Sequence, residues 1–537
     1  MTEKELVGRR AAGHGFLRAA VAARGDGPIY GHSPTQASGG VFARLVREID
    51  PQARTEFIPG DHLHRLSDPG VLYLGDAILP PFARLRLRQG PAAYSLCGVS
   101  HTTATTSTMD AICDYLSAPV APWDAFICTS AAVLETVRRL HEAEADYLRW
   151  RLGDGVRIEG PQLPVIPLGV HCDDFVFSEA QRAAARDALG LDADEIVALY
   201  VGRFVFHGKA HPLPMYRALE EAAARTGRRV ALVQCGWAPG KFIQDAFERG
   251  AADFAPSVRT IFVDGRIPEG RERAWASADL FVSLVDGIQE SFGLTPIEAK
   301  AAGLPVIVTD WDGYRDTVRE GVDGFRIATW APGEGAGQPL ARAFEAGTLD
   351  YGRYCWSAAA STSIDMGELF NRITALVDDA GLRRRMGEAG RQDARANYDW
   401  AVVYRQYQAL WGELTARRLA AAAEPGMAQR LAAAPRVSPR RLDPFVAFGH
   451  YPTSSIGRTT VLRPSPEASA ETLRTLHAHP LFHEVLVSAD AASSLLSVVQ
   501  RGAVTIADAA AALSQPETAV SRTAGLLAKM GLVEFAG

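Results

Sequence analysis

Residues 286–318 read DGIQESFGLTPIEAKAAGLPVIVTDWDGYRDTV, and this stretch decides the fold. A helix-forming run begins near Gly293 and Pro296, and the strand-like PVIVTD follows it. Proline suits the first helical position, and glycine lets a ligand approach the backbone closely. We therefore expect a helix N-terminus with free N–H groups beside the end of a strand. Such an end binds phosphate well.

Two glutamates, Glu290 and Glu298, frame the start of this helix with seven residues between them. On the first turn, Glu298 could accept two hydroxyl hydrogen bonds from a ribose. Thr295-x-x-Glu298 is also a capping box, in which both side chains satisfy the helix's own N–H groups. From spacing alone, capping is the stronger interpretation.

A second feature lies upstream, where YVGRFVFHGK (200–209) follows a strand-like run. Arg203 and Lys209 leave the strand end together with two glycines, a geometry that could aim two cations at a diphosphate. For any single arginine or lysine near a turn, exposure to solvent is the commoner outcome.

Strands and helices alternate on both sides of these motifs. Short apolar runs separated by helical stretches recur from about residue 27 to 175, and the pattern restarts over residues 196–309. This alternation predicts an α/β protein with two consecutive doubly wound domains. Their ligand site is expected at the carboxyl ends of the strands, in the cleft between the domains.

Together the motifs resemble a known family. GRFVFHGKAHP (202–212) and residues 287–313 resemble the donor-binding domain of the retaining glycosyltransferases with the GT-B fold, glycosyltransferase family 4. PVIPLGVHCDDF (164–175) is similar to the family's inter-domain strand and turn, and NYDWAVVYRQYQALW (397–411) to its closing helix. The resemblance covers about 164–411 well. It implies a GT-B architecture, in which two Rossmann-like domains face a cleft.

The resemblance also implies residue roles. Arg203 and Lys209 would contact the pyrophosphate of the donor and Glu298 its ribose, although the interval from Arg203 to Lys209 is one residue longer than in the family's commonest form. Glu290 and four backbone N–H groups would face the donor sugar and the distal phosphate. Those four N–H groups belong to Ser291, Phe292, Gly293 and Leu294.

The first domain offers His101, which directly follows the strand-like run AYSLCGVS. A lone histidine is more often a packing or capping residue than a catalytic one. The family commonly has a histidine after a comparable strand that reaches the transferred sugar, so His101 joins Glu290 as a candidate catalytic residue. The family's N-terminal glycine loop could correspond to Gly13-His14-Gly15 or to Gly39-Gly40, and the sequence leaves both open.

The expected domains follow from these assignments. Residues 1–175 form the acceptor-side Rossmann-like domain, and 176–395 form the Rossmann-like domain that binds the nucleotide sugar. A helix at 396–418 packs back on the first domain, and 419–444 are an Ala/Arg/Pro-rich linker. Residues 445–537 form a small, mainly α-helical domain.

That last domain resembles a winged-helix module. Thr505 is expected to open its second helix, Ser514-x-x-Glu517 to cap the third, and Leu532 to Phe535 to form a short strand. The third helix offers only Arg522 and Lys529 as cations, which argues against DNA binding. A protein or peptide partner and a packing or dimerisation role remain as alternatives.

The implied function is transfer of a sugar, with retention of configuration, from a UDP- or GDP-sugar to a hydroxyl acceptor. The acceptor is a glycan, a lipid-linked sugar, or a protein or peptide. We expect no required cofactor and no metal, because cations and the helix N-terminus can stabilise the leaving diphosphate. The alternatives are another GT-B activity, such as a phosphorylase or a nucleotide-sugar epimerase, and a non-catalytic regulatory or binding protein.

Composition limits the partners and the location. A net charge of -6 over 537 residues argues against general binding to nucleic acid. No stretch has the apolar length of a signal peptide or a transmembrane segment, so a cytoplasmic protein is expected. FARLRLR places Arg84, Arg86 and Arg88 in alternation; a solvated helix or edge strand is the favoured interpretation, with peripheral membrane contact as a minor one.

Overall fold

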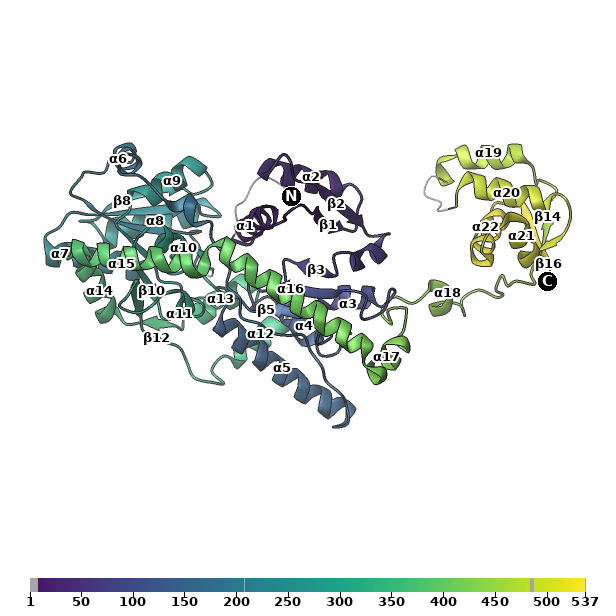
Figure 1. The fold of residues 1–537 in the computed structure, drawn as a ribbon, viewed down its shortest axis with the longest axis horizontal. Helices are drawn as coiled ribbons and strands as arrows, with labels where there is room; N and C mark the ends of the chain where they lie inside the picture. Colours follow the sequence, from purple (N-terminus) through teal and green to yellow (C-terminus); the bar gives the residue numbers. More distant parts are fainter. Residues whose placement is uncertain (1–7, 207, 483–486, 537) are drawn as a thin grey trace. The chain divides into compact units, whose positions relative to one another are not determined.

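The computed structural model describes residues 8–206, 208–482 and 487–536 (Figure 1). The chain divides into two compact units, Met1–Ser438 and Pro439–Gly537, which are described separately. The first unit contains two α/β halves. No helix within the described ranges combines the length and the apolar character needed to cross a bilayer.

The first half of this unit carries two small parallel sheets instead of one continuous sheet. One sheet pairs β1 with β2, and the other has the order β3-β4-β5. The elements are α1 (Gly8–Ala22), β1 (Ile29–Ser33), α2 (Ser38–Ile49), β2 (Thr55–Pro59), η1 (Leu63–Ser67), β3 (Val71–Leu74), α3 (Pro80–Arg86), β4 (Ser95–Val99), α4 (Thr106–Asp114), β5 (Ala125–Ile127) and α5 (Ala131–Leu152).

The second half is a six-stranded parallel sheet of order β11-β10-β9-β6-β7-β8. Three of its four inner strands are buried along their whole length because helices cover both faces, which is why they read as continuous apolar runs. The elements are η2 (Cys172–Phe175), α6 (Glu179–Ala188), β6 (Ile196–Val201), α7 (Leu213–Thr226), β7 (Val230–Gly236), α8 (Lys241–Phe254), β8 (Arg259–Asp264), α9 (Pro268–Ser277), β9 (Leu280–Ser283), α10 (Leu294–Ala301), β10 (Val306–Thr309), α11 (Tyr314–Thr317) and β11 (Gly324–Ile327).

The remaining elements of the unit complete the second half and return to the first. Helix α16 crosses back, and its aromatic residues pack with Phe16 and Tyr73 of the first half. The elements are β12 (Thr329–Trp330), α12 (Gln338–Glu345), α13 (Tyr351–Ala359), β13 (Ser363–Ile364), α14 (Met366–Asp378), α15 (Ala380–Asp393), η3 (Ala394–Tyr398), α16 (Trp400–Ala423) and α17 (Pro425–Ala432). The predicted α/β class, with two consecutive halves built on parallel strands, is confirmed, but the first half has two small sheets where one was expected.

The second unit is a helical domain with a three-stranded antiparallel sheet of order β15-β14-β16. Thr505 caps α21 as predicted. The predicted cap at Ser514 is wrong: Ser514 ends α21 with a φ of 51°, and α22 starts without a side-chain cap. The elements are α18 (Pro444–Ala447), β14 (Val461–Pro464), α19 (Ala470–Ala478), η4 (Pro480–Phe482), α20 (Ala489–Val499), β15 (Val504–Thr505), α21 (Ile506–Leu513), α22 (Glu517–Lys529) and β16 (Val533–Ala536).

The interpretation of the FARLRLR arginines as solvated is wrong for two of the three. Arg86 and Asp124 are fully buried, with Nη1 and Oδ1 2.6 Å apart, and Arg84 pairs with Asp114 at 2.7 Å. Only Arg88 is exposed. Buried charges persist only when they are paired, and these carboxylates lie far along the chain. Two of the three arginines are therefore not available for the membrane contact that was the minor hypothesis.

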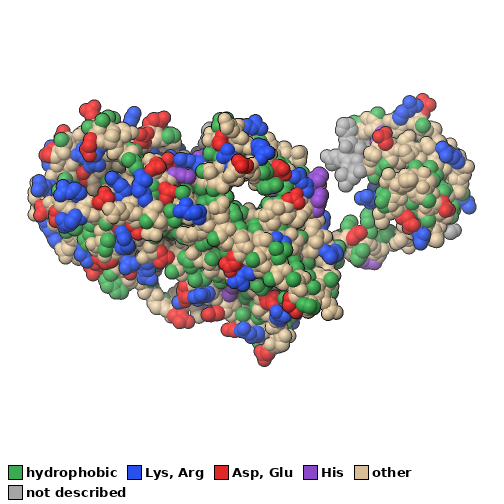
Figure 2. Space-filling model, viewed as in Figure 1, with side chains coloured by type: hydrophobic (Ala, Val, Ile, Leu, Met, Phe, Trp, Pro, Cys, Tyr) green, Lys and Arg blue, Asp and Glu red, His purple; other side chains and the backbone are tan. Residues whose placement is uncertain are grey.

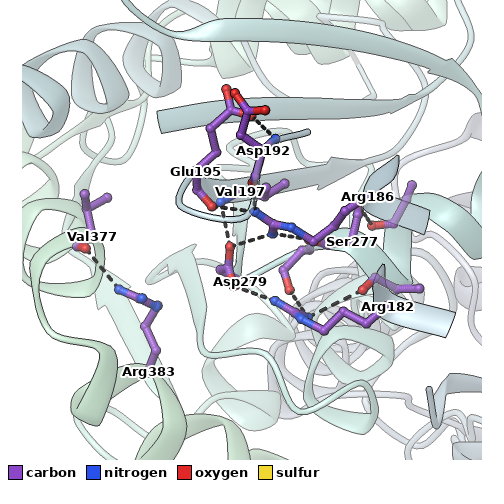
Figure 3. A network of polar contacts seen from close by, with 12 residues as sticks. Arg182, Arg186, Asp192, Glu195, Val197, Ser277, Asp279, Val377 and Arg383 are labelled. Carbon is purple, nitrogen blue, oxygen red and sulfur yellow. Dashed lines mark hydrogen bonds and ion pairs between the residues drawn. The ribbon is translucent and has the colours of Figure 1, made fainter. Parts of the chain in front are cut away.

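A second polar network fixes α6 against the sheet (Figure 3). Asp279, just before β9, accepts hydrogen bonds from Arg182 at 2.5 Å and from the backbone N–H of Val197 at 2.8 Å. Arg186 adds bonds to Asp279 and to the carbonyl of Ser277. The network ties α6 to the edges of β6 and β9. On the face drawn in Figure 2, cations and carboxylates are intermingled over this half.

Replacement of Arg86 tests the buried pair. Arg86→Ala leaves the Asp124 carboxylate buried without its cation, so the free energy of unfolding should fall by about 3–5 kcal/mol. Arg88→Ala, in the same segment but exposed, is the matched control and should change it by less than about 0.5 kcal/mol. Urea unfolding of the two variants measures both values; equal effects would contradict a structural role for the pair.

Candidate functional site

A cleft of ≈ 770 Å³ is lined by residues from both halves of the first unit. The carboxyl ends of β4, β6 and β7 and the start of α10 border it. Every site residue predicted from the sequence lines this one cleft, although they come from three separate stretches of chain. They are His101, Arg203, Lys209, Glu290, Ser291, Phe292, Gly293, Leu294 and Glu298.

The start of α10 presents uncapped backbone N–H groups. Gly293 is the N-cap with a φ of 91°, and a Cβ there would lie 2.0 Å from the ring of Tyr314, so only glycine fits. Neither Thr295 nor Glu298 caps the helix. The capping interpretation is therefore wrong, and Pro296 is the third helical residue instead of the first. The free N–H groups make this end of α10 suited to an anion.

Glu290 is held in its ionised form. Burial by itself would raise the pKa of Glu290, but Lys209 and the backbone N–H groups of Ser291 and Phe292 outweigh it, so the pKa is lowered. Lys209 Nζ lies 2.8 Å from Glu290 Oε2. The positive charge that Lys209 presents to the cleft is therefore partly neutralised by Glu290.

Arg203 differs from Lys209 because its guanidinium has no ion-pair partner among the described residues. Space beside it depends on Gly208, where a Cβ would lie 3.4 Å from Arg203 Nη2 and 2.7 Å from Gln289 Oε1. A half-buried cation without an ion-pair partner, in the same cleft as the start of α10, favours an anionic ligand.

Glu298 lies half-buried in the cleft wall. Burial raises the pKa of Glu298 to about 7, against the opposing charges of Arg271 and Lys209. Arg271, in the first turn of α9, lines the cleft and was missed by the sequence analysis. Its position just after the carboxyl end of β8 is the one signal that could have indicated it.

Two acidic residues near the site were also passed over. Asp310 and Asp312 follow β10 with Asp-x-Asp spacing. Burial and the charge of Glu290 raise the pKa of Asp312 to about 8. Asp310 instead faces Arg315 and Arg326. Within the described ranges, no group of three or more metal-ligating side chains forms a candidate metal site.

The first half contributes His101, whose backbone carbonyl accepts a hydrogen bond from Ser291 Oγ at 3.0 Å. Helix α1 adds Arg18, which no motif indicated, and His14, which lies between the glycines of one candidate glycine loop. Arg18 Nη1 donates to Asp174 Oδ2 at 2.6 Å. This pair fastens α1 to the segment that joins the two halves.

The two candidates for the N-terminal glycine loop, Gly13-His14-Gly15 and Gly39-Gly40, lie in different elements. Gly15 lines the cleft but lies inside α1, where a Cβ would lie 2.4 Å from Trp400 Nε1. Gly39 and Gly40 start α2 after β1, and neither lines the cleft. Gly13-His14-Gly15, the first candidate for this loop, is therefore part of a helix.

Trp237 and Arg266 also line the cleft. Trp237 follows β7 and Arg266 follows β8. Arg266 Nη2 lies 2.7 Å from Asp264 Oδ2. The carboxyl ends of neighbouring parallel strands thus bring the two side chains to one edge of the sheet.

Comparison with known proteins bears mainly on the second half. Residues 181–333 match the family described as Glycosyl transferases group 1. The D-inositol 3-phosphate glycosyltransferase of Nocardia farcinica is 34% identical over 187 residues, covering 33% of this chain and 39% of the relative. That of Segniliparus rotundus is 30% identical over 212 residues, covering 37% and 45%. The chain thus spans about two fifths of the length of the curated relatives it matches.

Among solved structures, the Anabaena protein Alr3699/HepE in complex with UDP has a TM-score of 0.49 and 15% identity, covering 75% of this chain and 96% of that one. Sucrose-phosphate synthase from Thermosynechococcus elongatus has a TM-score of 0.44 and 20% identity, covering 75% and 92%. The segment of this chain that carries the family match contains Arg203, Lys209, Glu290 and Glu298.

The raised pKa of Glu298 gives a testable pH dependence of stability. Between the unfolded pKa near 4.5 and the folded pKa of about 7, the folded state keeps a proton that the unfolded state has lost, so stability falls as pH rises through this window. Glu298→Gln removes the cost of the buried charge. It should stabilise the chain at pH 8 by on the order of 2 kcal/mol and have little effect at pH 4. Urea unfolding at both pH values measures this difference. An equal effect at the two pH values would contradict the raised pKa.

Proposed function

We propose that this chain is a retaining glycosyltransferase that moves a sugar from a UDP- or GDP-sugar to a hydroxyl acceptor. The observation that best supports this proposal is that one cleft contains an arginine without an ion-pair partner, an uncapped helix start and two glutamates, all from the matched segment. The curated relatives are named as glycosyltransferases, which supports the same reaction class.

In this proposal the donor diphosphate lies between Arg203 and the first N–H groups of α10. Breaking the bond between sugar and phosphate leaves negative charge on the diphosphate and positive charge on the anomeric carbon. A fixed cation and a helix N-terminus stabilise the negative charge as it develops, at no cost of rearrangement. Lys209 adds a second positive group, shared with Glu290.

The two glutamates divide the recognition of the donor. Glu298 accepts hydrogen bonds from the ribose hydroxyls, and the ionised Glu290 faces the transferred sugar together with the backbone N–H groups of Ser291, Phe292, Gly293 and Leu294. A negative charge at Glu290 also stabilises the positive charge on the anomeric carbon. Neither role needs a metal.

On the opposite wall, His101 would contact the transferred sugar and serve with Glu290 as the catalytic pair. The retained configuration is explained by attack of the acceptor on the same face that the diphosphate leaves, with the leaving phosphate helping to take the acceptor's proton. The acceptor enters from the first half, next to Arg18 and His14. It is a glycan, a lipid-linked sugar, or a protein or peptide.

The second unit is proposed as a winged-helix-like module that binds a protein or peptide partner. Its last helix, α22, carries only Arg522 and Lys529 as cations, too few for a DNA backbone. A module of this kind could bring a protein acceptor to the enzyme.

A ligand panel tests the donor site. Purified protein is melted with UDP, GDP, ADP, dTDP and their sugar conjugates. One nucleotide class should stabilise it, by about 2.7 kcal/mol at about 100 times its Kd. Arg203→Ala and Glu298→Ala should lose this stabilisation. Arg249→Ala, an exposed arginine of α8, is the matched control and should keep it. No response of the wild-type chain to any nucleotide, or full retention in Arg203→Ala, would contradict the proposal.

A further inference from the structure

The N-terminus of α5, in the first half, lies directly against the donor loop of the second half, by which we mean residues 290–293 before α10. Ser130 is the N-cap of α5, and its Oγ accepts from the backbone N–H of Val133 at 3.1 Å. The same hydroxyl donates to the carbonyl oxygen of Ser291 at 2.8 Å. The Ser130 hydroxyl thus uses its proton as a donor and one of its lone pairs as an acceptor, and only the bond from Val133 caps the helix.

Ser291 continues the connection across the cleft. Its Oγ donates to the backbone carbonyl of His101 at 3.0 Å, just beyond the end of β4. Ser130 is fully buried and Ser291 is 4% exposed, so the bond between them is shielded from water, and the bond from Ser291 to His101 is partly buried. Hydrogen bonds shielded in this way are costly to break, because the groups left behind stay unsatisfied.

A charged contact reinforces the same junction. Asp316 Oδ2 accepts from the backbone N–H of Ala131, the first residue of α5, at 2.6 Å. A carboxylate at a helix N-terminus is stabilised by the helix dipole. The Tyr398 hydroxyl in turn donates to the carbonyl of Asp316 at 2.8 Å, which links the junction to the segment that starts α16.

We infer that Ser130 and Ser291 form a bridge that sets the position of the donor loop relative to His101. Both hydroxyls act as positioning groups, since neither needs to touch the reacting atoms. The bridge joins the loop that carries Glu290 to the strand end that carries His101, so its length fixes the separation of the two candidate catalytic residues. The catalytic part of this inference rests on the proposed function.

The competing explanation is that Ser130 only caps α5. Loss of an N-cap destabilises any helix locally, so a control for uncapping is needed. Ser178 provides it, because it caps α6 on an exposed surface of the same unit. Ser291→Ala also distinguishes the bridge from simple capping, because Ser291 caps no helix.

Hydrogen exchange of the intact chain tests the bridge without any ligand. In Ser291→Ala, backbone amides of residues 100–104 and 131–134 should exchange about fivefold faster, as expected for one lost hydrogen bond. Ser130→Ala should give the same pattern, Ser291→Thr should restore wild-type exchange, and Ser178→Ala should change only the start of α6. Unchanged exchange at 100–104 in Ser291→Ala would overturn the bridge.

Turnover of the donor then tests its catalytic consequence. With the nucleotide sugar identified by the ligand panel, Ser291→Ala should keep the donor KM, because the N–H groups and cations that bind the donor remain. Its kcat should fall by about 100-fold, the loss that a displacement of about 1 Å in the reacting groups produces. Wild-type kcat in Ser291→Ala would overturn the positioning role. A wild-type chain that binds no nucleotide would overturn the proposed function instead, while the exchange result would still decide the bridge.

Discussion

The cleft depends on a single buried ammonium group. Lys300 is fully buried, and its Nζ lies 2.5 Å from Asp393 Oδ2 and 3.2 Å from Asp323 Oδ2, and donates to the carbonyl of Thr317 at 2.7 Å. Helix α10 has only eight residues and would not form by itself in water. These contacts hold its C-terminal turn against α15 and the segment before β11. Its N-terminus therefore points into the cleft in one fixed direction.

The same constraint explains the shape of the site around α10. Because the helix is fixed from its far end, its first turn needs no capping side chain and leaves its N–H groups to a ligand. Glycine at 293 is required by a left-handed φ and by the ring of Tyr314. The opposite wall is fixed by Ser130, whose hydroxyl accepts in the cap of α5 and donates to the donor loop. The start of α10 and the first-half wall of the cleft are thus built from rigid elements.

Local spacing in the sequence was enough to predict the strands and helices of the second half, whereas the candidate site residues came from the resemblance, because spacing alone favoured capping for Glu298. The pair Glu290 and Glu298, with Gly293 between them, lies in one short stretch, so its relation to the strand before and after it can be read directly. The capping interpretation failed because it needs the helix to begin two residues later than it does. Only the conformation of Gly293 decides that start, and tertiary packing sets it.

The sequence did not reveal which residues distant along the chain pair with one another. Arg84 and Arg86 looked solvated because their carboxylate partners lie 30 and 38 residues away. Arg271 and Arg18 enter the cleft only through the packing of whole elements, and no motif marks them. The division of the first sheet has the same origin, since alternation of strands and helices does not reveal which strands pair.

The central claim is that the uncapped start of α10 and Arg203 together hold a diphosphate. The most direct measurement is a crystal structure of the chain grown with the nucleoside diphosphate that stabilises it most. Such a crystal should show electron density for the distal phosphate within hydrogen-bonding distance of the Arg203 guanidinium and of the backbone N–H groups of residues 293–295. A nucleotide bound elsewhere, with this end of α10 occupied only by solvent, would contradict it.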